Sequence, residues 1–347
     1  MTKLPKIADL SLKGKRVLVR ADLDLGEDVT SDARLEALVP TLKDLMSKSA
    51  KIILIGHRGR PGGVRIDGLS LRDVAKRLSR LLKSEVLFVD EVEGEKVTKA
   101  VENMKDSEVL MLENLRFDER EEKNDEEFAK KLASFGDIYV NEAFANSHRN
   151  HASIVALPSQ AKFKSGRAVG LHFEKEIVHL DKVLVDAVRP LITIISGVKN
   201  DKMKYVEDFV RLSDKVLIGG RLPEYIHDDS PLRKNEKILV AGLIADKEDI
   251  SINTIESFEK EIKKAKSILI NGPLGKFEED GHTQGTKRVL SCVSNTDAFK
   301  VAGGGETVRA LEKFEVKDKF DWVSLGGGSM LEYLTKGALP GIQALLN

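Results

Sequence analysis

Cysteine is almost absent from the chain: Cys292 is the single one among 347 residues. One cysteine cannot form a disulfide within the chain, which fits a reducing compartment. Long apolar runs are also absent. No stretch approaches the 18 residues of a membrane-spanning helix, and the first residues lack the apolar segment of a signal peptide. We therefore expect a cytoplasmic protein that does not act in a membrane.

Net charge is absent as well. Lys plus Arg and Asp plus Glu number 56 each, so no overall field attracts nucleic acid or a membrane surface. Any anion site must therefore be local. The apolar content of 41% and the charged content of 32% are those of an ordinary globular protein. A length of 347 residues exceeds one typical core, which favours two domains.

Three common motifs are missing. The segment Gly281–Lys287 is one residue short of a Walker A loop, and Arg288 follows it where Ser or Thr is required. No GxGxxG sequence follows the first strand, which disfavours a dinucleotide dehydrogenase. His148 and His151 have no nearby cysteine or matching carboxylates, so zinc is disfavoured.

Strand-like apolar runs alternate with helical patterns along most of the chain. Ser31–Ser47 has leucines and valine on one helical face, and Ser70–Asp73 has the spacing of a capping box before another helix. The alternation predicts α/β architecture, with two doubly wound, parallel-sheet (Rossmann-like) domains facing each other across a cleft. We expect domains at 1–160 and 186–335, a connecting helix within 161–185, and a tail, 336–347, that packs back on the first domain.

The expected strands end in different chemistry in the two halves. In the first half they run into charged residues, and in the second half they run into glycine-rich turns such as Ser196-Gly197-Val198-Lys199 and Asn271-Gly272-Pro273. Ligands of open parallel sheets bind beyond the carboxyl ends of the strands. Arginine and histidine there suit a small anion, and bare backbone at a helix start suits a phosphate chain. The pattern indicates phosphoryl transfer between two sites.

Simpler interpretations exist for each half. A single arginine past a strand is most often part of a surface or interdomain ion pair, and a single glycine run is most often a tight turn. The recurrence of each feature after several strands favours the functional interpretation over these alternatives.

Nearly from end to end, the sequence resembles the motifs of the phosphoglycerate kinase family. It looks like a short, divergent member of that family. The matching segments include Lys15–Leu25, Gly56–Gly63, Val109–Asp125, Tyr139–Ser153, Arg189–Lys202, Asn271–Glu278, Val301–Val308 and Val323–Leu334. The resemblance implies a reversible transfer of a phosphoryl group from 1,3-bisphosphoglycerate to ADP, giving 3-phosphoglycerate and ATP. It also implies Mg²⁺ as cofactor, and we expect a monomer.

The resemblance also implies roles for individual residues. The acid substrate would contact Asp22, Leu23, Asp24, Arg34, His57, Arg58, Gly59, Arg60, Arg116 and Arg149. The nucleotide would contact Gly197, Lys199, Lys202, Gly219, Asn271, Pro273, Glu278, Gly303, Gly304, Gly305, Glu306 and Thr307. Glu306 would hold the metal. The residues expected to act in catalysis are Arg34, Lys199, Lys202, Gly304 and Gly327.

The chain departs from the family pattern at several positions. Asp24 replaces the usual asparagine, Gly26 a proline, Glu306 an aspartate and Arg221 a glycine, and the segment between Arg221 and Asn271 is much shorter than usual. The residue roles implied by the resemblance therefore apply less well to the nucleotide site than to the acid site. Two alternatives stay open: a binding or regulatory relative that transfers phosphate poorly, and a kinase of another small acid.

Overall fold

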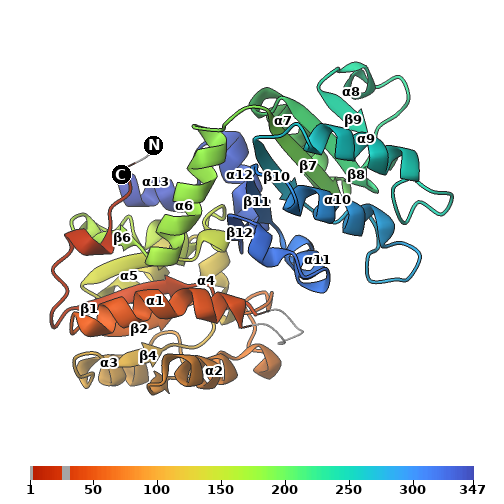
Figure 1. Cartoon of the computed structure of the whole chain (residues 1–347). Helices are drawn as coiled ribbons and strands as arrows, with labels where there is room; N and C mark the ends of the chain where they lie inside the picture. The colour runs from red at the N-terminus through yellow and green to blue at the C-terminus, as the bar shows by residue number, and fades with distance from the viewer. Residues whose placement is uncertain (1–2, 26–31) are drawn as a thin grey trace. The chain divides into compact units, whose positions relative to one another are not determined.

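The computed structural model describes residues 3–25 and 32–347 (Figure 1). Two compact units divide the chain. The first unit contains the residues up to Lys175 together with Ala338–Asn347, and the second contains Glu176–Gly337. Helix α6 (Leu171–Leu184) carries the chain from the first unit into the second, and α13 (Pro340–Leu346) belongs to the first unit again. Gly26 and Ser31 lie outside the described residues.

The first unit is built on a six-stranded sheet of order β3-β4-β2-β1-β5-β6, in which every neighbouring pair is parallel. Its strands are β1 (Arg16–Ala21), β2 (Lys51–Ile55), β3 (Val86–Phe88), β4 (Val109–Met111), β5 (Ile138–Glu142) and β6 (Arg167–Val169). Its helices are α1 (Ala33–Ser47), α2 (Arg72–Leu82), α3 (Glu95–Glu102), α4 (Glu119–Glu122) and α5 (Glu126–Ser134). Leucines of α1 and α2 pack with the strands into one core.

The structure of this unit differs from the sequence-based expectations in three details. Strands β3 and β6 were not predicted, because three residues are too few to show an alternating pattern. Strand β6 also lies beyond residue 160, the expected end of the domain. The predicted capping box is not formed, since helix α2 has no side-chain cap. Ser70 Oγ instead donates to Glu113 Oε2 over 2.8 Å.

The connecting helix occupies only the later part of the expected range 161–185. Residues 161–170 hold a 3-10 helix and β6, and α6 starts at Leu171. Glu142, at the end of β5, accepts hydrogen bonds from the amides of His172 and Phe173, both over 3.0 Å. The first free amides of α6 are therefore satisfied by a carboxylate distant in sequence.

The second unit contains another parallel sheet, of order β12-β11-β10-β7-β8-β9. Its strands, which follow the alternation of apolar runs expected from the sequence, are β7 (Leu191–Gly197), β8 (Lys215–Gly220), β9 (Ile238–Val240), β10 (Ser267–Asn271), β11 (Phe299–Gly303) and β12 (Trp322–Ser324). Its helices are α7 (Val206–Leu212), α8 (Pro231–Lys234), α9 (Ile252–Ile262), α10 (Gln284–Ser294), α11 (Gly305–Lys313) and α12 (Gly327–Lys336).

Helices cover both faces of this second sheet. α9 contacts α10, and α7 contacts α12 (Figure 1). Between the strands and these helices lies a core of isoleucine, leucine, valine and phenylalanine side chains. Because all strands of a sheet run the same way, their carboxyl ends lie at one edge in each unit, which places the charged and glycine-rich segments together there. The expected two-domain α/β class is confirmed. Within the described ranges, no helix combines the length and the apolar character needed to cross a membrane.

Candidate active site

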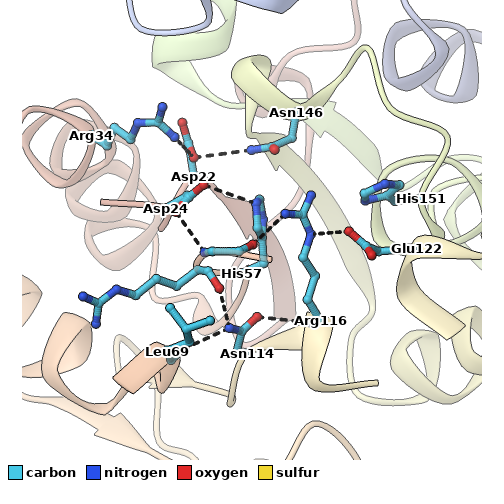
Figure 2. Close-up of polar contacts among 12 residues, drawn as sticks. Asp22, Asp24, Arg34, His57, Leu69, Asn114, Arg116, Glu122, Asn146 and His151 are labelled. Atoms are coloured by element: carbon cyan, nitrogen blue, oxygen red, sulfur yellow. Dashed lines mark hydrogen bonds and ion pairs between the residues drawn. The ribbon is translucent and has the colours of Figure 1, made fainter. Parts of the chain in front are cut away.

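Two aspartates follow β1 and are tied to different partners (Figure 2). Asp22 Oδ1 accepts from Arg34 Nη1 over 2.6 Å and from Asn146 Nδ2 over 3.3 Å. Asp24 Oδ1 accepts from the amide of Gly59 over 3.0 Å. The charge of Asp22 raises the pKa of Arg34 above its ordinary value. Arg34 is therefore a fixed cation at the start of α1, oriented by a carboxylate.

The side chain of Leu23, between the two aspartates, does not face the candidate site. It is fully buried in the core of the first unit. A contact between Leu23 and the acid substrate, as the resemblance implies, would therefore be made by its backbone.

His57, just past β2, is buried beside arginine. Arg20 Nη2 donates to His57 Nδ1 over 2.9 Å, and His57 Nε2 lies 3.8 Å from Asp24 Oδ2. The pKa of His57 is well below its ordinary value, because burial and then the charges of Arg20, Arg116 and Arg149 oppose protonation. His57 is thus a neutral hydrogen-bonding group inside a positively charged pocket.

Arg20 is a site residue that the motif analysis missed. It is fully buried, and its Nε donates to Ser153 Oγ over 2.7 Å. Ser153 Oγ in turn donates to Glu121 Oε1 over 2.6 Å. Glu121 is also fully buried, and desolvation raises its pKa. The signal for Arg20 was present in the sequence, since a charged residue inside an apolar strand requires a buried partner.

The remaining arginines of the first unit gather around the same pocket. Arg116 Nη1 donates to Gly59 O over 2.8 Å, and its Nε lies 3.2 Å from Glu122 Oε1 (Figure 2). Burial, followed by the charge of Arg149, lowers the pKa of Arg116 to about 10. The pKa of Arg149 is also lowered, by burial and then by the charge of Arg60. Arg60 itself is exposed.

Several buried nitrogens of this pocket have no hydrogen-bond partner among the described residues. They are Arg116 Nη2, Arg149 Nε and His151 Nδ1, besides the Arg116 Nε that only approaches Glu122. Arg58 Nε also has no partner within residues 3–25 and 32–347, but the Arg58 charge acts on Asp73 of α2 and is not among the charges that shift the pKa values of this pocket. Buried donors without partners cost free energy in an isolated protein. Guanidinium groups that repel one another and carry free N–H groups form a binding site for a phosphate or carboxylate.

In the second unit, hydrogen bonds join two glycine-rich turns, and a third turn packs against them. Asn271 Nδ2 donates to Gly303 O over 2.8 Å. Thr307 Oγ1 accepts from the amide of Gly272 and donates to Gly303 O, each over 2.8 Å. A Cβ atom on Gly327 would lie 2.5 Å from the Cα of Gly304, so the two glycine loops touch and only glycine fits. Gly304, with φ +99°, is the N-cap of α11.

Lys202 lies beside the turns that contain Ser196 and Asn271. Its Nζ donates to Ser196 O over 2.6 Å and to Asn271 O over 3.4 Å. Burial lowers its pKa to about 8, and the nearby carboxylates of Asp201 and Glu306 act in the opposite direction. An ammonium group held by carbonyl oxygens has donor capacity left for an anion.

A cavity of about 550 Å³ opens at this edge of the second sheet. The predicted nucleotide residues that line it are Gly197, Lys199, Lys202, Pro273, Glu278 and Glu306. Other predicted residues are not in its lining: Gly219, Asn271, Gly303, Gly304, Gly305 and Thr307. Asn271, Gly303, Gly304 and Thr307 form the hydrogen-bonded turns described above. Gly219 packs against Leu274, whose Cδ2 would lie 2.2 Å from a Cβ atom.

The predicted metal ligand is an exposed carboxylate on the cavity wall. Glu306 is in the first turn of α11 and lies 3.1 Å from Arg309 Nη1. In the described part of the chain, no three His, Cys, Asp or Glu residues converge into a metal site. Magnesium is commonly held by one or two carboxylates together with substrate phosphates. Carboxylates that line the cavity without converging fit that mode of binding and do not fit a resident metal site.

These two sites define the class of protein. One unit carries a buried arginine and histidine pocket for a small anion, and the other carries a cavity with lysines and glycine turns suited to a phosphate chain. That pairing on two α/β domains is typical of phosphotransferases.

Comparisons with known proteins agree. The phosphoglycerate kinase family model matches residues 7–228 and 230–337. The phosphoglycerate kinase of Dictyoglomus turgidum is 37% identical over 390 aligned positions, covering 98% of this chain and 97% of the relative. That of Coprothermobacter proteolyticus is 36% identical over 393 positions, covering 99% of each. Both alignments exceed the 347 residues of this chain, so each relative contains segments that this chain lacks.

Solved structures agree as well. Phosphoglycerate kinase from Coxiella burnetii matches with a TM-score of 0.83 and 26% identity, covering 99% of both chains. The enzyme from Pyrococcus horikoshii OT3 matches with a TM-score of 0.84 and 26% identity, covering 99% of this chain and 98% of the other. The chain belongs to the phosphoglycerate kinase family. The expected phosphotransferase activity is thereby confirmed, and no comparison favours either alternative.

Proposed function

We propose that the first unit holds 3-phosphoglycerate or 1,3-bisphosphoglycerate and that the second unit holds ADP or ATP. The observation that carries the proposal is the set of buried guanidinium nitrogens without partners in the first unit. The glycine turns and Lys202 at the cavity of the second unit support the nucleotide half. We further expect the protein to be a cytoplasmic monomer.

The acid substrate supplies its own nucleophile. A carboxylate is already ionised at neutral pH, so attack on a terminal phosphate needs no general base, and catalysis depends on positioning and charge neutralisation. In this proposal His57, Arg60, Arg116 and Arg149 bind the phosphate that stays on the acid. Arg34, held by Asp22, faces the phosphoryl group that moves. Direct in-line transfer also requires a hinge closure that brings the two substrates together.

The nucleotide half depends on residues of the second unit. Lys199, Lys202 and the free amides at the starts of α11 and α12 would neutralise the phosphate oxygens. Glu306 would hold Mg²⁺, which supplies positive charge to those oxygens when the nucleotide is bound.

A coupled assay tests this function directly. Purified protein is given 3-phosphoglycerate with ATP and Mg²⁺, and the acyl phosphate product is reduced by an added dehydrogenase. Turnover supports the proposal. A panel of other small acids serves as the comparison, and faster turnover of one of them would reassign the substrate. Calorimetry that finds acid binding without nucleotide binding would contradict the enzyme assignment.

A further inference from the structure

The cavity of the second unit has a charged wall that phosphate binding does not use. Arg221 follows the last residue of β8, and its amide donates to Gly197 O over 2.9 Å, beside the lysine-bearing turn. Its Nε donates to Glu224 Oε2 over 2.6 Å, which fixes the guanidinium. Arg221 and Glu248 both line the cavity. The wall is therefore an arginine and a carboxylate side by side.

Glu248 is held in place by its backbone. Its amide donates to Asp246 Oδ1 over 3.0 Å, and its carbonyl accepts from the amide of Lys276 over 2.8 Å. The side chain remains 31% exposed. Arg221 Nη1 lies 3.5 Å from Glu248 Oε1, at the limit of a hydrogen bond. The carboxylate oxygens thus keep their capacity to accept hydrogen bonds from a ligand.

The position of this wall assigns it to the base of a nucleotide. Lys199, Lys202 and Glu306 lie in the part of the lining that suits phosphates and a metal ion. Gly220, Arg221 and Glu248 also line the cavity, and this charged pair is left for another part of the ligand. This step rests on the proposed function, because it takes the cavity to be the nucleotide site.

The chemistry of the wall distinguishes the purines. Guanine presents two adjacent donors, N1–H and the N2 amino group, next to the acceptor O6. A carboxylate accepts from the two donors, and a guanidinium donates to O6 or N7. Adenine offers a carboxylate one donor, the N6 amino group, and the lone pair of its N1 repels the second carboxylate oxygen. We propose that Glu248 and Arg221 select guanine, so that the preferred nucleotides of this protein are guanosine diphosphate and triphosphate.

Calorimetric titration of the intact protein with Mg²⁺ and ADP, GDP or IDP tests the proposal. GDP is expected to bind about tenfold more tightly than ADP, and IDP, which lacks the N2 amino group, should fall between them. Equal or tighter binding of ADP overturns the proposal. Equal binding of IDP and GDP also overturns the proposal, because the protein would then not recognise the N2 amino group.

Variants separate base recognition from loop stability. Glu248→Ala should weaken the binding of GDP roughly tenfold and leave the binding of ADP nearly unchanged. Glu248→Gln keeps one acceptor oxygen and should therefore weaken the binding of GDP less. Glu256→Ala, an exposed glutamate on α9 outside the cavity lining, is the matched control and should keep the preference. If Glu248→Ala weakens the binding of ADP and of GDP equally, Glu248 only stabilises its loop and the proposal fails.

The binding experiment and the activity assay fail independently. If no nucleoside triphosphate supports turnover of 3-phosphoglycerate, the proposed function is overturned, while the order of nucleotide affinities still decides the base preference. If ATP supports turnover at least as efficiently as GTP, the base preference is overturned and the proposed function stands.

Discussion

Arg20 donates a hydrogen bond to Nδ1 of His57 over 2.9 Å, and both side chains are buried. Arginine has no acceptor, so Nδ1 must carry a lone pair and the ring proton must sit on Nε2. That N–H points toward the side where Asp24 Oδ2 lies 3.8 Å away. The buried arginine therefore fixes which face of the imidazole can donate to a ligand.

We expect His57 to keep this neutral form throughout the range from about pH 5 to 8, where an ordinary histidine titrates. Its pKa is well below the ordinary value because of burial and three neighbouring arginines. Nitrogen chemical shifts of labelled histidine should show a constant Nε2-protonated ring. The His57 signal is assigned by its loss in the variant His57→Gln. A His57 signal that titrates near pH 6 would contradict this assignment.

His151 links the charged pocket to acid stability. Burial, and then the charges of Arg116 and Arg20, lower its pKa to about 3. The unfolded state takes up the proton near pH 6.5, before the folded state does, so stability falls as the pH decreases from about 6.5 toward 3. The loss is at most about 1.4 kcal/mol per pH unit and is reduced by solvent screening.

Urea unfolding at pH 7.5 and 5.0 measures this effect. The free energy of unfolding should decrease from pH 7.5 to pH 5.0 in both proteins. The decrease should be about 1 kcal/mol smaller in His151→Gln than in the unmodified protein. His227→Gln replaces an exposed histidine and should follow the unmodified protein. Identical losses in all three proteins would show that His151 does not titrate on unfolding.

Lys202 predicts the pH dependence of nucleotide binding. Its pKa of about 8 results mainly from burial. The charged form, which binds phosphate, dominates below pH 8 and is lost above it, so the Kd for ADP should rise by up to about tenfold per pH unit above 8. In Lys202→Gln, binding should be weak and nearly independent of pH in this range. Lys204→Gln, a neighbouring lysine outside the cavity lining, should keep the rise. An unchanged slope in Lys202→Gln would assign the titration elsewhere.

Local patterns were sufficient to predict the strand ends and the residues at them. The six strands of the second unit and most of the arginine pocket follow from apolar runs that stop at charge or glycine. What could not be predicted depends on contacts between distant segments. Glu121 and Asn146 join the pocket only because folding brings them to Ser153 and Asp22. Likewise, the start of α6 is set by Glu142, a residue of β5.

Arg34 is expected to act in the transfer step. Its guanidinium is fixed by Asp22 and stays charged at any working pH. Arg34→Ala should lower kcat by roughly 10³-fold, on the scale of arginines that neutralise a moving phosphoryl group. Arg80→Ala, on the exposed side of α2, is the control and should leave kcat unchanged. A kcat within tenfold of the original value, with an unchanged circular dichroism spectrum, would remove Arg34 from the transfer step.

Asp24 places a negative charge where the acid substrate, itself an anion, is expected to bind. Its Oδ1 accepts from the amide of Gly59, and asparagine could accept the same bond through its carbonyl oxygen. Asp24→Asn should therefore keep the loop geometry and remove only the repulsion. At about 4 Å in a partly hydrated pocket that repulsion is worth about 1 kcal/mol or more, so the Kd for 3-phosphoglycerate should fall by about three- to tenfold. Asp67→Asn removes a 96% exposed carboxylate in the same unit and should leave the Kd unchanged. Weaker binding by Asp24→Asn would mean that the carboxylate itself orients the substrate, through His57 or a bound cation.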